Sequence, residues 1–174
     1  MKKVAFLVVF FTIAINGLAQ NSRQDLMDYL AKNVNSLDPI EGLYDVEWNC
    51  RYITPFVDQS YGIFSASMII VKRNDGTFYI AYGSGYGFDS YEYKILNNIT
   101  ISRLGATNVY NFTYYTSKCR IYLTDNNTHF IAKMELDNGS ARKLIPWMNI
   151  APSVHIYPVY DCIKTYPTPS MYRR

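Results

Sequence analysis

The chain has 174 residues, of which 49% are hydrophobic and 16% aromatic, and 17 basic residues face 14 acidic ones. The formal net charge is only +3, and no basic stripe runs along the chain, so the composition argues against nucleic-acid binding. The most unusual feature is the 17 tyrosines, because tyrosine favours β-strands and combines an apolar ring with a polar tip.

Residues 1–19 have the pattern of a secretory signal peptide. Lys2 and Lys3 form a positive start, an apolar run extends from Val4 to Ile15, and small residues precede Ala19. The run is too short for a membrane span, and no stop-transfer pattern follows it. We therefore expect cleavage after Ala19 and a secreted or periplasmic mature chain without an integral membrane span. That chain has about 155 residues, which suits one domain, and a net charge of about +1.

The segment from residue 20 to 37 predicts one N-terminal helix. Its apolar residues repeat at helical spacing (Leu26, Leu30, Val34 and Leu37). Ser22, followed three residues later by Asp25, is typical of a helix start, and Asp38-Pro39 ends the pattern. From residue 38 to 167 the apolar period changes to two, which predicts a single β domain, and residues 168–174 form a tail.

The β domain is predicted to consist of short strands joined mostly by hairpins. The clearest strand extends from Tyr44 to Tyr52, with one apolar and one charged face. Asn74-Asp75-Gly76 and Asp137-Asn138-Gly139 are typical hairpin turns. The other strands are predicted over residues 62–72, 77–82, 91–96, 99–104, 109–115, 118–124, 128–136, 141–145, 154–160 and 163–166.

A meander of this length exposes two sheet edges unless it closes on itself. We therefore predict a mainly β fold, an antiparallel up-and-down β-barrel with the N-terminal helix packed against one end. No second helix is expected. A two-sheet β-sandwich is the alternative.

The three cysteines, Cys50, Cys119 and Cys162, are spaced too widely for a zinc knuckle or a CxxC redox site. A closed barrel places its first and last strands side by side, so Cys50 and Cys162 are the disulfide candidates in an oxidising compartment. Cys119 is then left over. The alternative is that all three are thiols of the core.

Two short motifs resemble the ends of an uncharacterised family of secreted bacterial β-domains. Residues 38–44, DPIEGLY, match its IEG-x-Y/W start, and residues 163–167, IKTYP, match its IK-x-YP end. The resemblance covers Asp38 to Pro167 and implies a barrel-like fold in a Gram-negative secreted protein, without a known catalytic residue. Gly42-Leu43-Tyr44 is also similar to the Gly-x-Trp that opens lipocalins and other calycin barrels, with tyrosine in place of tryptophan.

No catalytic or metal-binding pattern is recognisable in the chain. The only histidines, His129 and His155, are interpreted as strand or surface residues, and no serine has a protease signature around it. The acidic residues are scattered, without metal-ligand spacing. We predict no catalytic residue, metal or cofactor. An enzyme with an unrecognised site remains an alternative.

The stretch AYGSGYGFDSYEY, from Ala81 to Tyr93, resembles a functional glycine-rich loop. Its G-x-G-x-G spacing matches neither a nucleophile elbow nor a dinucleotide-binding turn, and a Walker lysine is missing. We interpret it as a connection between strands, with its tyrosines on the barrel rim. The predicted ligand contacts are Trp48, Tyr82, Tyr86, Tyr91 and Tyr93.

The sequence thus predicts a secreted, non-catalytic binding or accessory domain. The expected inward residues either fill the barrel or line a cavity for one small apolar molecule; they are Phe78, Ile80, Phe130, Ala132, Met134 and Leu136. The alternatives are carbohydrate or surface-polymer binding through exposed tyrosines, and an interaction with an envelope protein or a protease.

Overall fold

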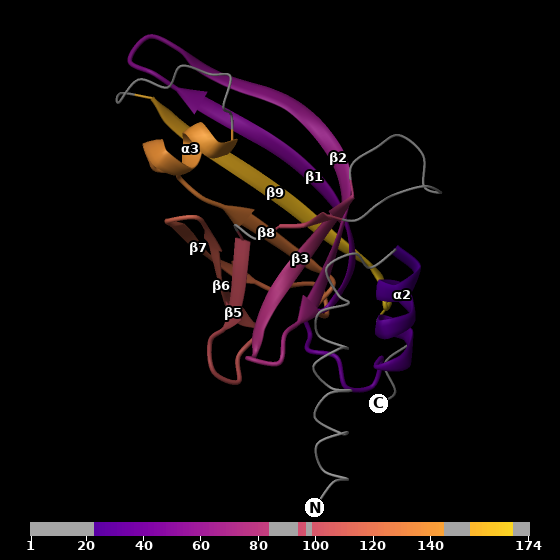
Figure 1. Cartoon of the computed structure of the whole chain (residues 1–174). Helices are drawn as coiled ribbons and strands as arrows, with labels where there is room; N and C mark the ends of the chain where they lie inside the picture. Colours follow the sequence, from indigo (N-terminus) through magenta and orange to yellow (C-terminus); the bar gives the residue numbers. More distant parts are fainter. Residues whose placement is uncertain (1–22, 84–93, 97–98, 145–153, 169–174) are drawn as a thin grey trace, which may run out of the picture.

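The main feature of the computed structural model is one antiparallel sheet curled into a nearly closed barrel (Figure 1). It describes residues 23–83, 94–96, 99–144 and 154–168. The strands are β1 (Gly42–Ile53), β2 (Asp58–Lys72), β3 (Thr77–Gly83), β4 (Lys94–Ile95), β5 (Ile99–Arg103), β6 (Val109–Tyr114), β7 (Ser117–Tyr122), β8 (His129–Lys133) and β9 (His155–Tyr166). The helices are α2 (Arg23–Lys32) and α3 (Asn138–Leu144).

The strands follow the order β7-β6-β5-β3-β2-β1-β9-β8, and β4 pairs with β3. The first and last strands, β1 and β9, are paired from Leu43 and Tyr166 at one end to Ile53 and His155 at the other. The remaining seam lies between β7 and β8, where an isolated bridge joins Thr124 to His129. The predicted antiparallel up-and-down barrel is therefore confirmed.

Alternate residues of each strand point into the barrel, as the period of two predicts. Tyr44, Val46 and Cys50 of β1 belong to the inner core, whereas Leu43 belongs to a second cluster outside the barrel. The six predicted inward residues (Phe78, Ile80, Phe130, Ala132, Met134 and Leu136) are all buried in the inner core.

Helix α2 lies against the outer face of the sheet, so its predicted position at one end of the barrel was wrong. Leu26 and Leu30 of α2 pack with Ile69 of β2 and Tyr79 and Ala81 of β3, all on the outer side. The physical reason is the unbroken apolar run from Met68 to Val71. Such a run has no polar face, and both of its faces must be covered.

Helix α3 replaces the strand predicted over residues 141–145 and contradicts the expectation of a single helix. Asp137 does not begin a hairpin turn but caps α3, because its Oδ1 accepts the Ser140 backbone N–H at 2.8 Å. Ala141 then packs into the inner core. The sequence Asp-Asn-Gly is compatible with both a tight turn and a helix start. The cap formed by the Asp137 side chain favours the helix.

Two further strand predictions differ in extent from the structure. The segments 154–160 and 163–166 form the single strand β9, because its backbone continues without a turn through Asp161 and Cys162. Of the strand predicted over 91–96, the described part is β4, which pairs Ile95 with Ala81 of β3.

Candidate functional site: an apolar cavity inside the barrel

A cavity of about 280 Å³ lies inside the barrel. It is lined by side chains from the inward faces of seven strands and from Leu96, which directly follows β4. The lining residues are Val46, Trp48, Met68, Ile80, Tyr82, Leu96, Ile99, Phe112, Tyr114, Phe130, Tyr160 and Cys162.

The space arises from a change in side-chain size along the barrel axis. Near the start of β1, large rings fill the interior: Tyr44 packs edge-on against Phe130, with ring centroids 5.3 Å apart. Phe78 and Tyr110 pack in the same way at 5.9 Å. Further along the axis, the smaller side chains of Val46 and Cys162 lie opposite each other on β1 and β9. These two side chains are smaller than the rings of Tyr44, Phe78 and Tyr110, and they leave room beside Phe130, which lies opposite Cys162 and lines the cavity.

The strand directions define the two ends of the barrel. β1, β3 and β6 run away from the ring-filled end, which we call the closed end, and β9 runs towards it. The opposite end, towards which β1 runs, is called the far end. Trp48 therefore lies nearer the far end than Val46, and Tyr160 lies nearer to it than Cys162.

Tyr82, Tyr160 and Cys162 of the cavity lining are neutral at physiological pH. Burial raises the pKa of Tyr160, Tyr82 and the Cys162 thiol. Tyr114 also raises the pKa of Tyr160, whereas Trp48 lowers it. Among the described lining residues there is no Asp, Glu, Lys, Arg or His. The lining thus offers apolar surface and neutral hydrogen-bonding groups.

Trp48 and Tyr82, two of the five predicted ligand contacts, both lie in the cavity lining. Tyr82 points into the barrel, so it is not part of an exposed stacking surface. Tyr86, Tyr91 and Tyr93 lie outside the described residues.

Several lining residues were missed by the sequence analysis, above all Tyr114, Tyr160 and Phe112. Their strands were predicted, and their period-two positions mark them as inward. Their height along the barrel axis depends on the register between strands that are distant in sequence, which no local pattern indicates.

The predicted Cys50–Cys162 disulfide is wrong, and all three cysteines are free. β1 and β9 are neighbours as expected, but Cys50 lies opposite Pro158 and Cys162 lies opposite Val46. This offset of four residues separates the two cysteines by about 13 Å along the strands, beyond the roughly 7 Å limit for a disulfide. Cys50 and Cys162 are core thiols, only 2% and 1% exposed.

The two motifs that carry the family resemblance meet at the closed end of the barrel. Leu43 of the first motif pairs with Tyr166 of the second. The Lys164 ammonium donates a hydrogen bond to the Pro39 carbonyl oxygen. It also lies 5.5 Å from the centroid of the Tyr44 ring. The two motifs therefore join the ends of the β domain.

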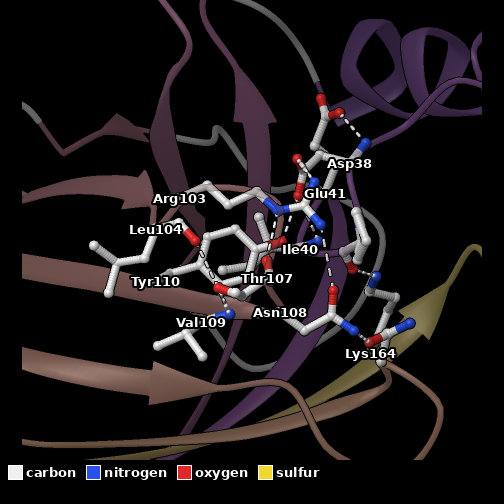
Figure 2. Close-up of polar contacts among 12 residues, drawn as sticks. Asp38, Ile40, Glu41, Arg103, Leu104, Thr107, Asn108, Val109, Tyr110 and Lys164 are labelled. Atoms are coloured by element: carbon white, nitrogen blue, oxygen red, sulfur yellow. Dashed lines mark hydrogen bonds and ion pairs between the residues drawn. The ribbon is translucent and has the colours of Figure 1, made fainter.

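A network of buried polar groups completes the closed end (Figure 2). Asp38 accepts hydrogen bonds from the Arg103 guanidinium at 2.9 Å and from the Tyr110 hydroxyl at 2.5 Å. Glu41 accepts the backbone N–H groups of Asp38 at 2.7 Å and of Lys72 at 2.9 Å. Both carboxylates are buried with partners, as buried charges require. None of these groups lines the cavity.

The two histidines contact carboxylates away from the cavity. His129 Nε2 lies 2.7 Å from Asp161 Oδ1, and His155 Nδ1 lies 2.6 Å from Glu135 Oε1. Within the described ranges, no three His, Cys, Asp or Glu side chains are grouped to hold a metal ion.

Comparison with known proteins adds no family to this description. No protein-family model matches the chain, and no curated protein matches it. None of the described helices is long and apolar enough to span a membrane.

Proposed function

We propose that this chain is an exported, non-catalytic binding protein that holds one small apolar molecule in the barrel cavity. The observation that carries the proposal is the cavity of about 280 Å³ and its lining of aliphatic and aromatic side chains. Barrels of about eight strands have interiors that hold one small ligand when side chains do not fill them.

The cavity volume sets the size of the ligand. A dry apolar cavity of about 150 Å³ binds benzene, and pockets for larger ligands start at about 300 Å³. A molecule of one or two rings, with about ten non-hydrogen atoms, therefore fits. At about 0.6 kcal/mol per atom, such a ligand gains about 6 kcal/mol, which corresponds to a Kd of tens of micromolar.

Equilibrium dialysis of the purified protein against toluene and naphthalene tests this proposal. We expect saturable binding of one molecule per chain. Cys162→Phe places a phenyl ring in the cavity, and because one benzene ring fills a cavity of about 150 Å³, the space left for a ligand shrinks and the affinity should fall at least tenfold. Ile163→Phe is the matched control, because the neighbouring Ile163 is 56% exposed on the outer face of β9.

The proposal fails if the unmodified protein binds neither hydrocarbon, or if the two phenylalanine variants lose affinity equally. Thermal unfolding of both variants shows whether each one folds.

Export is the second part of the proposal, and it rests on the pattern of residues 1–19. We expect the protein recovered from the periplasm or the medium to begin at Gln20. A mass spectrum of the recovered protein that shows residues 1–19 still attached would contradict this.

A further inference from the structure

Eight of the twelve residues that line the cavity form two successive sets with different chemistry. The lower layer, nearer the closed end, consists of Val46, Ile80, Phe112 and Cys162. Two residues further along each of the same strands, towards the far end, lie Trp48, Tyr82, Tyr114 and Tyr160. We call this second set the girdle. Every member of the girdle has an apolar ring and one neutral hydrogen-bonding group.

The members of the girdle lie close to one another and to other lining residues. Trp48 lies directly opposite Tyr160 in the β1–β9 register. Tyr114 and Tyr82 both contribute to the raised pKa of Tyr160, after its burial. The Tyr160 ring also packs at 6.2 Å against Phe112 of the lower layer. The other three members of the girdle thus lie near Tyr160, and the apolar residues Met68 and Ile99 lie opposite Tyr82 and Tyr114 in the strand register.

The buried charges of the barrel interior lie elsewhere. Asp38, Glu41, Arg103 and Lys164 are at the closed end and bind one another or backbone groups there. No described residue of the lining carries a charge that could compensate an ionic ligand. A carboxylate brought into such surroundings loses its hydration without gaining a partner, which is strongly unfavourable.

We propose that the cavity selects an uncharged molecule with an apolar ring body and one hydroxyl or carbonyl group. The ring body occupies the lower layer, and the polar group hydrogen-bonds to the girdle. Carboxylates, including fatty acids, are rejected. This inference rests on the proposed function and deepens it by naming the class of ligand.

Three probes of similar size test the inference by equilibrium dialysis at pH 7. They are naphthalene, 2-naphthol and 2-naphthoate. We expect 2-naphthol to bind about three- to tenfold more tightly than naphthalene, as one additional hydrogen bond provides. We expect the anion 2-naphthoate to bind at least a hundredfold more weakly than 2-naphthol.

Single substitutions in the girdle locate the hydrogen bond. At least one of Tyr82→Phe, Tyr114→Phe and Tyr160→Phe should abolish the preference for 2-naphthol while leaving the naphthalene affinity within twofold. Tyr122→Phe is the matched control, because Tyr122 is exposed at the end of β7 and should keep the preference.

The possible failures are distinguishable. If neither naphthalene nor 2-naphthol binds, the proposed function itself is wrong. If naphthalene binds but 2-naphthol is no tighter, the ligand class is wrong and the apolar site remains. The same conclusion follows if 2-naphthoate binds within tenfold of 2-naphthol, or if all three tyrosine variants keep the preference.

Discussion

Gly42 is the residue at which the closed end should be most sensitive to a single added methyl group. Its φ is +155°, a backbone region that is essentially restricted to glycine. A Cβ added there would lie 2.5 Å from the backbone oxygen of Tyr166 on β9 and 3.1 Å from the Lys164 side chain. The backbone oxygen cannot move away without opening the β1–β9 pair.

Gly42→Ala should therefore destabilise the protein by about 2–5 kcal/mol. Backbone strain contributes about 1–3 kcal/mol, and overpacking against β9 contributes the rest. Gly105→Ala is the matched control, because Gly105 also has a positive φ, +61°, but nothing lies within 4 Å of its added Cβ. Strain alone should cost the control about 1–2 kcal/mol.

Urea unfolding followed by far-ultraviolet circular dichroism measures both variants. Thermal midpoints should fall by about 2–4 °C for each kcal/mol in a domain of this size. If Gly42→Ala lost no more stability than Gly105→Ala, the close approach of Gly42 to Tyr166 would not matter to the fold, and the reasoning would be refuted.

Three further predictions concern titratable groups. Burial lowers the pKa of Lys164 to about 8, against the influence of Asp38 and Glu41. Between pH 8 and 10.5 the unfolded chain binds more protons at Lys164 than the folded chain does, so the free energy of unfolding of the wild type should rise with pH. Relative to Lys164→Met, the rise should reach about 3 kcal/mol. The control Lys133→Met keeps Lys164 and should show the same rise as the wild type. Hydrogen bonds, above all from Thr116, lower the pKa of the Asp137 carboxyl. This stabilisation should be lost as the pH falls below about 4, and urea unfolding of Asp137→Asn should lack that acid-side loss. Ellman's reagent should label neither Cys50 nor Cys162 in the native protein, and three thiols per chain in urea; a single thiol in urea would indicate a disulfide.

The barrel could be predicted because the sequence signals that specify it lie within short stretches of the chain. Each hairpin specifies its own neighbour, and the period of two separates the inner from the outer face. Helix α3 was missed because Asp137 can begin a turn or cap a helix, and the hydroxyl of Ser117, on β7, helps to hold it in place. Helix α2 covers the outer face of β2 because residues 68–71 are apolar on both faces of the strand. The sequence analysis assigned the strand but did not consider what covers its outer face.

The cavity could be predicted only in part, for a different reason. Trp48 and Tyr82 were identified from their own strands, but Tyr114 and Tyr160 join them only through the closure of the sheet. The same dependence on register separated Cys50 from Cys162. A one-residue or four-residue shift between β1 and β9 changes which side chains share a level, and sequence patterns within each strand are unaffected by it.

The two end motifs acquire a structural meaning from where they lie. Gly42 allows β9 to approach, and Lys164 donates to Pro39, so each motif requires the other. The girdle lies at another level of the barrel, on residues outside both motifs. Chains that share the motifs should therefore share the closed end, while their girdle residues are free to differ. On this argument the motifs predict how the barrel is closed, and the identity of the ligand must be inferred from the girdle.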